Sequence, residues 1–308
     1  MKLRQLQCLC AVVDGGFNIS RAGEALYATQ PAVSKQLRQL EEELGTDLLL
    51  RQGGRPVALT ESGERILGWA RRALQCTDNI RAISRERGGE SGGAIVLATS
   101  HTHANHLLPG PIAAFKLRFP KVRLHVIQGT PTQVSELIRD GKASIGVTNL
   151  PEALPRDVLA VPFLTSPRLL VLPVGHVLLK EKTLTLAKLA LHPMVLPQSE
   201  RRLGSRIVRR FQQAGLETDV VVHALDADVV KTYVAAGMGI GVVPDFAFSA
   251  ARDKGLRSRD VSHLFDPAES AVQLKRQSQL PRFAYQFLVH LNPLLEPGRL
   301  EALVLESA

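Results

Sequence analysis

The chain has 308 residues, 45% of them hydrophobic, and a formal net charge of +9. This length suits two or three domains, and the hydrophobic content is enough to bury a core, which excludes wholesale disorder. The positive charge fits an anionic partner but does not locate one, because residues 1–90 hold 13 Lys and Arg against 11 Asp and Glu. Three cysteines are too few for a disulfide framework, and no segment is as long and apolar as a membrane span. We expect a cytoplasmic protein with no cofactor and no membrane partner.

The chain begins with helical signals. Residues 3–14 and 20–26 are predicted to form helices, and Tyr27-Ala28 is predicted to form a tight turn. Cys8 and Cys10 are expected to fill the core beneath the first helix, with a redox sensor as the alternative.

A third helix is predicted after this turn, and Gly45 ends it. Thr29 is expected to supply its N-cap oxygen, and Pro31 suits the first turn because its missing N–H needs no partner there. Apolar residues recur at spacings of four, three and four, so one face of the helix is expected to be buried. These residues are Val33, Leu37, Leu40 and Leu44.

The other face of the third helix is polar. Gln, Ser and Lys side chains can hydrogen-bond to base edges, and Lys and Arg can neutralise phosphates. A short helix, a tight turn and a helix with a polar amino-terminal half form a helix-turn-helix, although an ordinary helical hairpin has the same periodicity. The residues expected to contact DNA here are Thr29, Gln30, Ser34, Lys35 and Arg38.

Residues 48–59 predict a two-stranded wing that turns at Gly53-Gly54. Arg51 and Arg55 flank this turn, where they are placed to reach phosphates or the minor groove. Both are therefore included among the expected DNA contacts.

A long helix is predicted over residues 60–87. Its apolar residues follow a heptad spacing, which favours a partner helix and hence a homodimer. The alternative is a helix that lies on its own domain. The residues of this seam are Ile66, Trp69, Ala73, Cys76, Ile80 and Ile83.

Residues 88–93 are glycine-rich and are expected to form a hinge. Their Gly-x-Ser-x-Gly pattern lacks the preceding buried strand of a serine hydrolase, so no catalysis is expected there. Strands and helices then alternate, which predicts two α/β halves with crossing connections. We expect lobe I over about 94–163 and 268–308, and lobe II over about 164–267.

Polar side chains stand where strands of the first half are predicted to end. Open α/β sheets bind ligands outside the carboxyl ends of their strands, and hydroxyls beside a helix start suit an anion. Helix capping is the alternative, and it is strong for Thr130. His101, His103 and His106 are close in sequence, but no nearby Cys or carboxylate completes a metal site. The residues expected at the strand ends are Ser100, Thr102, Thr130, Thr132 and Thr148.

The third helix resembles a known DNA-reading element: Thr29–Leu37 is similar to the recognition helix of LysR-type transcriptional regulators. Arg51 and Leu59–Gly63 follow at the spacing of that family's wing and linker helix. The resemblance covers nearly the whole chain. It implies an α/β protein with an all-α winged helix-turn-helix domain over 1–59, a dimerising linker helix over 60–87, and a two-lobed effector-binding domain over 88–308. That last domain would be similar to periplasmic binding proteins.

The implied partners of such a regulator are macromolecules and one small ligand. They are promoter half-sites in double-stranded DNA, RNA polymerase, a small-molecule effector, and further copies of the chain in a homodimer or homotetramer.

Four segments resemble the CysB subgroup of this family more closely: Met1–Leu3, Ser100–Thr102, Gln128–Gln133 and Asp226–Val234. That subgroup regulates sulfur assimilation and organosulfur use. The resemblance therefore implies a cleft for sulfate, acetylserine or a related sulfur metabolite.

The effector residues of the subgroup are only partly kept. Ser100 replaces a Thr, His103 replaces a Gln, and Arg202 stands where the second half has a Thr, while Thr102 and Thr148 are kept. An added Arg still suits an anion, but these departures leave the effector open. A LysR-type regulator of another pathway is one alternative. A binding module or an enzyme without DNA function is another, although no Ser/His/Asp, paired-carboxylate or metal spacing supports catalysis.

Overall fold

The computed structural model describes residues 1–87, 93–151, 153–197 and 203–305. Within these residues, no helix is both long and apolar enough to cross a membrane. The predicted hinge falls outside this part of the chain, apart from Gly93, which begins strand β3. The chain divides into two compact units, Met1–Glu90 with Ser278–Pro281, and Ser91–Gln277 with Arg282–Ala308.

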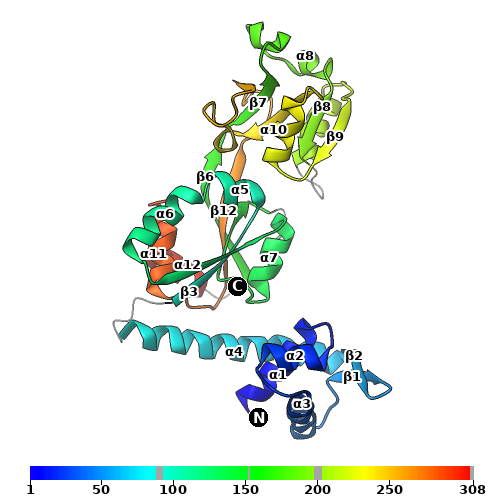
Figure 1. The fold of residues 1–308 in the computed structure, drawn as a ribbon, viewed down its shortest axis with the longest axis vertical. Helices are drawn as coiled ribbons and strands as arrows, with labels where there is room; N and C mark the ends of the chain where they lie inside the picture. Colours follow the sequence, from blue (N-terminus) through cyan, green and yellow to red (C-terminus); the bar gives the residue numbers. More distant parts are fainter. Residues whose placement is uncertain (88–92, 152, 198–202, 306–308) are drawn as a thin grey trace. The chain divides into compact units, whose positions relative to one another are not determined.

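The amino-terminal unit consists of helices and a β-hairpin (Figure 1). Its elements are α1 (Leu3–Asp14), α2 (Ile19–Ala25), α3 (Gln30–Leu44), β1 (Leu49–Gln52), β2 (Arg55–Leu59) and α4 (Glu61–Arg87). This order confirms the helix-turn-helix and the wing that the sequence predicts.

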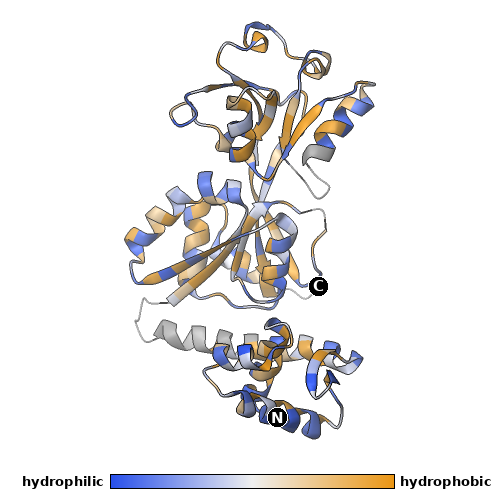
Figure 2. Cartoon of the chain, turned by 45° about the vertical axis from the view of Figure 1, so that its right-hand side comes forward, coloured by the Kyte–Doolittle hydropathy of each residue, from blue (hydrophilic) through white to orange (hydrophobic). Residues whose placement is uncertain are grey.

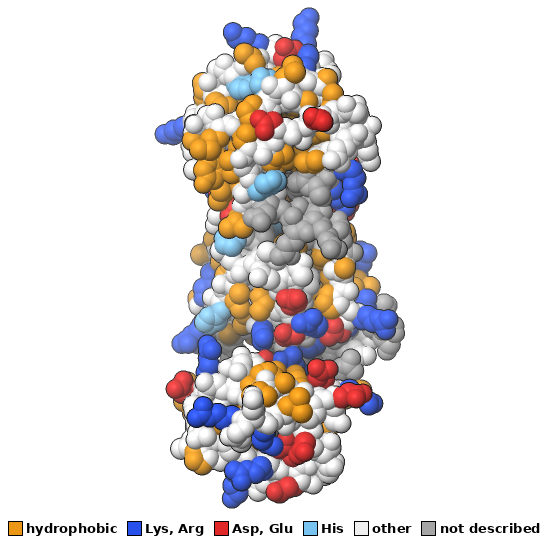
Figure 3. Space-filling view, turned by 90° about the vertical axis from the view of Figure 1, so that its right-hand side faces the viewer, with side chains coloured by type: hydrophobic (Ala, Val, Ile, Leu, Met, Phe, Trp, Pro, Cys, Tyr) orange, Lys and Arg blue, Asp and Glu red, His pale blue; other side chains and the backbone are white. Residues whose placement is uncertain are grey.

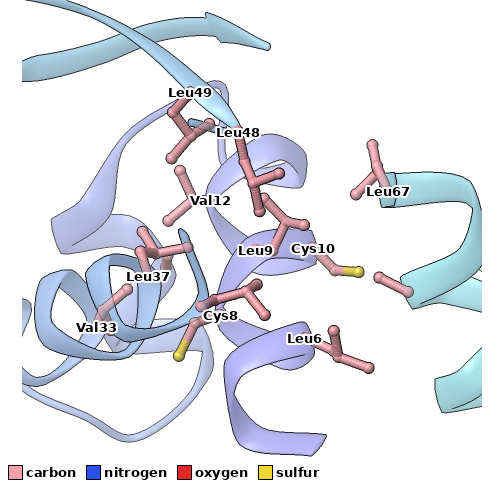
Figure 4. Packing of buried hydrophobic residues seen from close by; sticks show 13 residues of the cluster. Leu6, Cys8, Leu9, Cys10, Val12, Val33, Leu37, Leu48, Leu49 and Leu67 are labelled. Carbon is pink, nitrogen blue, oxygen red and sulfur yellow. The ribbon is translucent and has the colours of Figure 1, made fainter. Parts of the chain in front are cut away.

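Helix α3 packs on α1 through an apolar core (Figure 4). Val33, Leu37 and Leu40 are buried as predicted, whereas Leu44 is 38% exposed because it lies in the last turn, beside the terminating Gly45. The predicted cap oxygen is also wrong: Thr29 is the N-cap residue, but its side chain makes no capping hydrogen bond.

Two cysteines of α1 lie in this core. Cys8 and Cys10 are buried, and burial raises the pKa of the Cys10 thiol to about 11. A thiol that stays protonated at neutral pH is a poor redox sensor, so the packing interpretation is the better one.

Helix α4 has two different faces. Leu67 and Ala70 are buried in the core of the amino-terminal unit, as expected for a helix that lies on its own domain. Trp69 and Ile80 are 68% and 66% exposed, and Cys76 is exposed as well. The side chain of Ile83, the last residue of the predicted seam, lies outside the described part of the chain. An apolar stripe thus remains on α4 beside the face that its own domain covers.

The second unit contains two five-stranded sheets, and each sheet forms the centre of one lobe (Figure 1). Lobe I has the strand order β4-β3-β5-β12-β6. Its strands are β3 (Gly93–Thr99), β4 (Val122–Gln128), β5 (Ile145–Asn149), β6 (Val158–Ser166) and β12 (Ala268–Lys275). Its helices are α5 (His101–His106), α6 (Pro109–Arg118), α7 (Pro131–Arg139), α11 (Arg282–Leu291) and α12 (Pro297–Leu305).

Lobe II has the strand order β11-β7-β10-β8-β9. Its strands are β7 (Arg168–Pro173), β8 (Met194–Pro197), β9 (Val220–Ala224), β10 (Ile240–Pro244) and β11 (Leu256–Asp260). Its helical segments are η1 (Val177–Lys180), α8 (Leu186–Ala190), α9 (Leu203–Gln213), α10 (Ala227–Ala235) and η2 (Asp245–Ala247). The strands of both sheets carry much of the hydrophobic colour in Figure 2, as expected for sheets covered by helices.

The predicted single helix from the end of β3 to Arg118 is wrong. It is two helices, α5 and α6, because Pro109 has no N–H to continue the hydrogen bonding of α5. Elsewhere the local signals hold: α7 begins with the predicted Thr130 cap and Pro131, and β4 has the predicted bounds.

Candidate functional site

The polar face of α3 is open to solvent. Gln30, Lys35 and Arg38 are exposed, Ser34 is partly exposed, and Thr29 is exposed at the helix start. Lys and Arg side chains are interspersed with Asp and Glu over the amino-terminal unit in Figure 3. On the face that Figure 3 shows, the amino-terminal unit therefore has charges of both signs and no broad basic patch.

The start of the wing is hydrogen-bonded to a buried carboxylate of α3. Glu41, on the inner side of α3, accepts hydrogen bonds at Oε1 from the N–H groups of Leu48 and Leu49, at 3.0 and 3.2 Å. Its Oε2 forms an ion pair with Arg51 Nη2 at 2.8 Å. The sequence predicts that Arg51 reaches phosphates or the minor groove, and the structure also pairs its guanidinium with the Glu41 carboxylate. The signal was present, because Glu41 is four residues after the buried Leu37 and so shares its helix face.

The tip of the wing is a tight turn. Gly53 and Gly54 have φ angles of 58° and 78°, a left-handed conformation that glycine adopts without strain. Arg55 follows this turn at the start of β2 and is exposed. Its exposed side chain is accessible to a DNA backbone.

In lobe I, a buried histidine joins the start of α5 to the sheet. His103 is 1% exposed, and its Nδ1 lies 2.7 Å from the Ser100 hydroxyl, which also accepts from the His103 backbone N–H. Its Nε2 lies 2.9 Å from the Ser270 hydroxyl of β12. Burial lowers the pKa of His103 to about 4, so the ring is neutral at pH 7. His103 thus orients two hydroxyl groups and adds no charge.

The register of the sheet places Thr148 on the opposite face. Thr148 pairs with Ala271, whereas Ser270 pairs with Asn149, and neighbouring positions along a strand point to opposite sides. A side chain at Gly146, two residues before Thr148, would meet Val134 and Ile138 of α7. Thr148 therefore faces α7, on the opposite side of the sheet from Ser270.

Thr148 is buried without a hydrogen-bond partner. It has no exposed surface, and its Oγ1 meets no donor or acceptor among the described residues. The buried Oδ1 of the neighbouring Asn149 also lacks a partner among these residues. A buried hydroxyl without a partner costs about 1–3 kcal/mol, so such groups in native proteins usually signal a ligand, a water or a function.

The two threonines at the start of α7 differ. Thr130 Oγ1 accepts from the Gln133 N–H at 3.3 Å while Gln133 Oε1 accepts from the Thr130 N–H at 2.9 Å, which is a complete capping box. Thr132 is exposed. Capping accounts for Thr130, as the alternative interpretation held.

Thr102 joins the two lobes. Its Oγ1 accepts a 3.3 Å hydrogen bond from the Ala227 N–H at the start of α10. Asp228 follows Ala227 in α10. Burial acts to raise the pKa of its carboxyl, but hydrogen bonds from Asn105, His106 and Lys231 outweigh this effect and lower the pKa to about 2. Helix α5, which follows Ser100 and carries Thr102, is therefore hydrogen-bonded to the ionised Asp228 carboxylate of lobe II.

Arg202, the predicted contact from lobe II, lies outside the described residues. No group of three or more His, Cys, Asp or Glu suited to a metal occurs in the described ranges.

Two family models match this chain. The model of the bacterial regulatory helix-turn-helix protein, lysR family, matches residues 3–64, and that of the LysR substrate binding domain matches residues 88–295. Together they extend over both compact units.

Curated relatives match the chain over nearly its full length. It is 36% identical to the HTH-type transcriptional regulator CysB of Burkholderia cenocepacia, over 98% of this chain and 96% of that protein. It is 37% identical to SsuR of the same organism over 100% of both chains. It is 34% identical to the regulator cbl of Escherichia coli, over 100% of this chain and 98% of that one.

Solved structures share the fold. The cofactor-binding domain of the Cbl transcriptional regulator is 34% identical, with a TM-score of 0.67, over 71% of this chain and 96% of that chain. Full-length CbnR complexed with its target DNA is 23% identical, with a TM-score of 0.61, over 95% and 99% of the two chains. At that identity the second likeness supports the fold alone.

Proposed function

Because the chain belongs to the LysR family of DNA-binding transcriptional regulators, we propose that it controls genes of sulfur assimilation or organosulfur utilisation in response to a small anionic or acetylserine-type effector. Full-length similarity to CysB, SsuR and cbl supports this assignment. So does the resemblance of Gln128–Gln133 and Asp226–Val234 to the CysB subgroup.

In this proposal α3 reads the major groove. Gln30, Ser34 and Lys35 contact base edges, and Thr29 at the exposed helix start contacts the backbone beside them. Arg38 and Arg55 hold phosphates, whereas Arg51 contributes only through those N–H groups that Glu41 leaves unused.

The effector would bind at the carboxyl ends of the lobe I strands. The observation that carries this part is the buried Thr148 hydroxyl, which meets no partner among the described residues. Ser100, Thr102 and Thr132 supply further hydroxyls around α5 and α7, His103 orients Ser100, and Thr130 contributes by fixing the start of α7. Arg202 would add a positive charge from lobe II.

The exposed stripe of α4 supports association of the chain with itself. Trp69, Cys76 and Ile80 are spaced seven and four residues apart, so they form one seam that a partner helix can cover. We infer a homodimer through residues 60–87, assembly into a homotetramer, and contact with RNA polymerase at the promoter.

The test is the thermal stability of the full chain with sulfate, thiosulfate, O-acetylserine, N-acetylserine and adenosine phosphosulfate. A ligand at 100 times its Kd stabilises the folded state by about 2.7 kcal/mol, which a raised midpoint reports. We expect one of these ligands to raise the midpoint, and Thr148→Val to abolish the effect because valine keeps the shape without the hydroxyl. Ser144→Val, a change at a position outside the strand ends, serves as the control.

A response that Thr148→Val leaves intact would contradict this placement of the effector. No response to any of the five compounds would detach the regulator from sulfur and favour a LysR-type regulator of another pathway.

A further inference from the structure

A buried side chain of lobe II also has a polar atom without a hydrogen-bond partner among the described residues. Arg168 opens β7 and is 6% exposed. Its Nε donates to the Asp266 carbonyl at 3.3 Å, but its buried Nη1 finds no acceptor among the described residues. Burying a guanidinium N–H without an acceptor is costly, more so than for a neutral donor.

The positive charge of a second arginine, Arg206, acts on Arg168. Burial lowers the pKa of Arg168, the positive charge of Arg206 lowers it further, to about 10, and the carboxylate of Asp266 only partly opposes them. Arg206 is exposed and stands in the first turn of α9, where the partial charge of the helix end is also positive. Positive charge thus surrounds a donor that meets no acceptor among the described residues.

The place of Arg168 in the fold connects it to the effector site. Strand β6 leads directly into β7, and Ser166 at its end pairs with Ala268 of β12. Ser270, the partner of His103, is two residues further along β12, or about 7 Å at the usual rise of a strand. Arg168 follows Ser166 by two residues, at the crossover between the lobes.

We propose that Arg168 and Arg206 form a subsite for an oxyanion, such as an inorganic phosphate or sulfate or the carboxylate of a larger ligand. An oxyanion accepts from Nη1, which is otherwise unsatisfied, and offsets the repulsion between the two guanidinium groups. The planar guanidinium suits this task because it offers parallel N–H donors to a pair of oxygens. The inference does not rest on the sulfur assignment, since any small oxyanion has this chemistry.

The test uses the full chain and two probes, sodium phosphate and sodium acetate, each compared with sodium chloride at equal ionic strength. Arg206→Gln is the main variant, because Arg206 is exposed and its loss leaves the core intact. Arg209→Gln is the matched control, since it removes the same charge from an exposed position of the same helix. Arg168→Gln is the second variant.

Two opposite changes are expected from Arg206→Gln. In chloride its unfolding midpoint should be higher than that of Arg209→Gln, because a like-charge contact is relieved. With phosphate or acetate, the wild-type chain and Arg209→Gln should show a saturable rise in midpoint that Arg206→Gln and a folded Arg168→Gln lose.

An equal response of Arg206→Gln and Arg209→Gln to both probes would overturn the proposal, as would a response that rises without saturation. The sulfur test remains separate: Thr148→Val should keep the phosphate or acetate response, so this subsite stands or falls independently of the sulfur effector.

Discussion

A single buried imidazole organises the start of α5. Ser100 and Ser270 each hold one ring nitrogen of His103, and Phe246 of lobe II lies 5.2 Å from the ring. A charged ring there would lose its hydration and force both hydroxyls to act as acceptors. The neutral form is therefore the one that the fold requires.

This requirement predicts a pH dependence. The pKa of His103 is lowered from 6.5 to about 4, so between these values the unfolded chain binds a proton that the folded chain does not. Stability is complete above pH 6.5 and falls as the pH drops toward 4, by up to about 3 kcal/mol. Urea unfolding at neutral and at acid pH measures this loss.

The control separates His103 from other titrating groups. His103→Gln keeps a donor and an acceptor but cannot titrate, so it should lose much less stability on acidification than the wild-type chain. His101→Gln, at an exposed position, should behave like the wild type. Equal losses in all three proteins would contradict the assignment.

Among the elements, α3 has two functions. Its outer face carries Lys35 and Arg38 to solvent, while Glu41 on its inner side bonds the backbone of Leu48 and Leu49. The start of the wing is therefore held at a fixed position relative to α3.

We predict that Glu41→Gln destabilises the amino-terminal unit by about 1–3 kcal/mol, because the amide cannot neutralise Arg51 and leaves a charged group poorly paired. Glu42→Gln, one residue on and exposed, should change stability very little. Chemical unfolding of the two variants measures the difference. If both were as stable as the wild type, Glu41 would not connect α3 to the wing.

Elements with local signals could be predicted from the sequence. The apolar spacing of Val33, Leu37 and Leu40 specifies α3, and Thr130-Pro131 marks the start of α7. Strand β11 could not be found this way, because Leu-Arg-Ser-Arg-Asp has no apolar alternation and becomes a strand by pairing with β7. Helices α8 and α12 were also missed.

The site was only partly predictable for the same reason. Ser100 and Thr148 were found because each lies at the end of a recognisable strand. Ser270 comes from a strand far along the chain, and neither its bond to His103 nor the face on which Thr148 lies can be known before the strand register. The buried contact of Arg168 with Asp266 also depends on tertiary structure.

At the scale of the second unit, α5 and α10 connect the lobes. Thr102 accepts from Ala227, and Asp228 accepts from Asn105 and His106. These bonds adjoin the proposed effector contacts on α5, so a ligand that competes for Thr102 would change how the lobes meet. We propose that such a change is how effector binding alters DNA binding.

The most direct test of the account is the affinity of the full-length chain for a promoter fragment of sulfur-assimilation genes, measured by fluorescence anisotropy at increasing salt. We predict an affinity that falls steeply with salt, because phosphate contacts release counterions. Lys35→Ala should weaken binding about tenfold or more through the loss of a base contact, whereas Lys254→Ala, at an exposed position of the second unit, should bind as the wild type does. Unchanged affinity in Lys35→Ala, or no binding even at low salt, would contradict the assignment of α3 as the element that reads DNA.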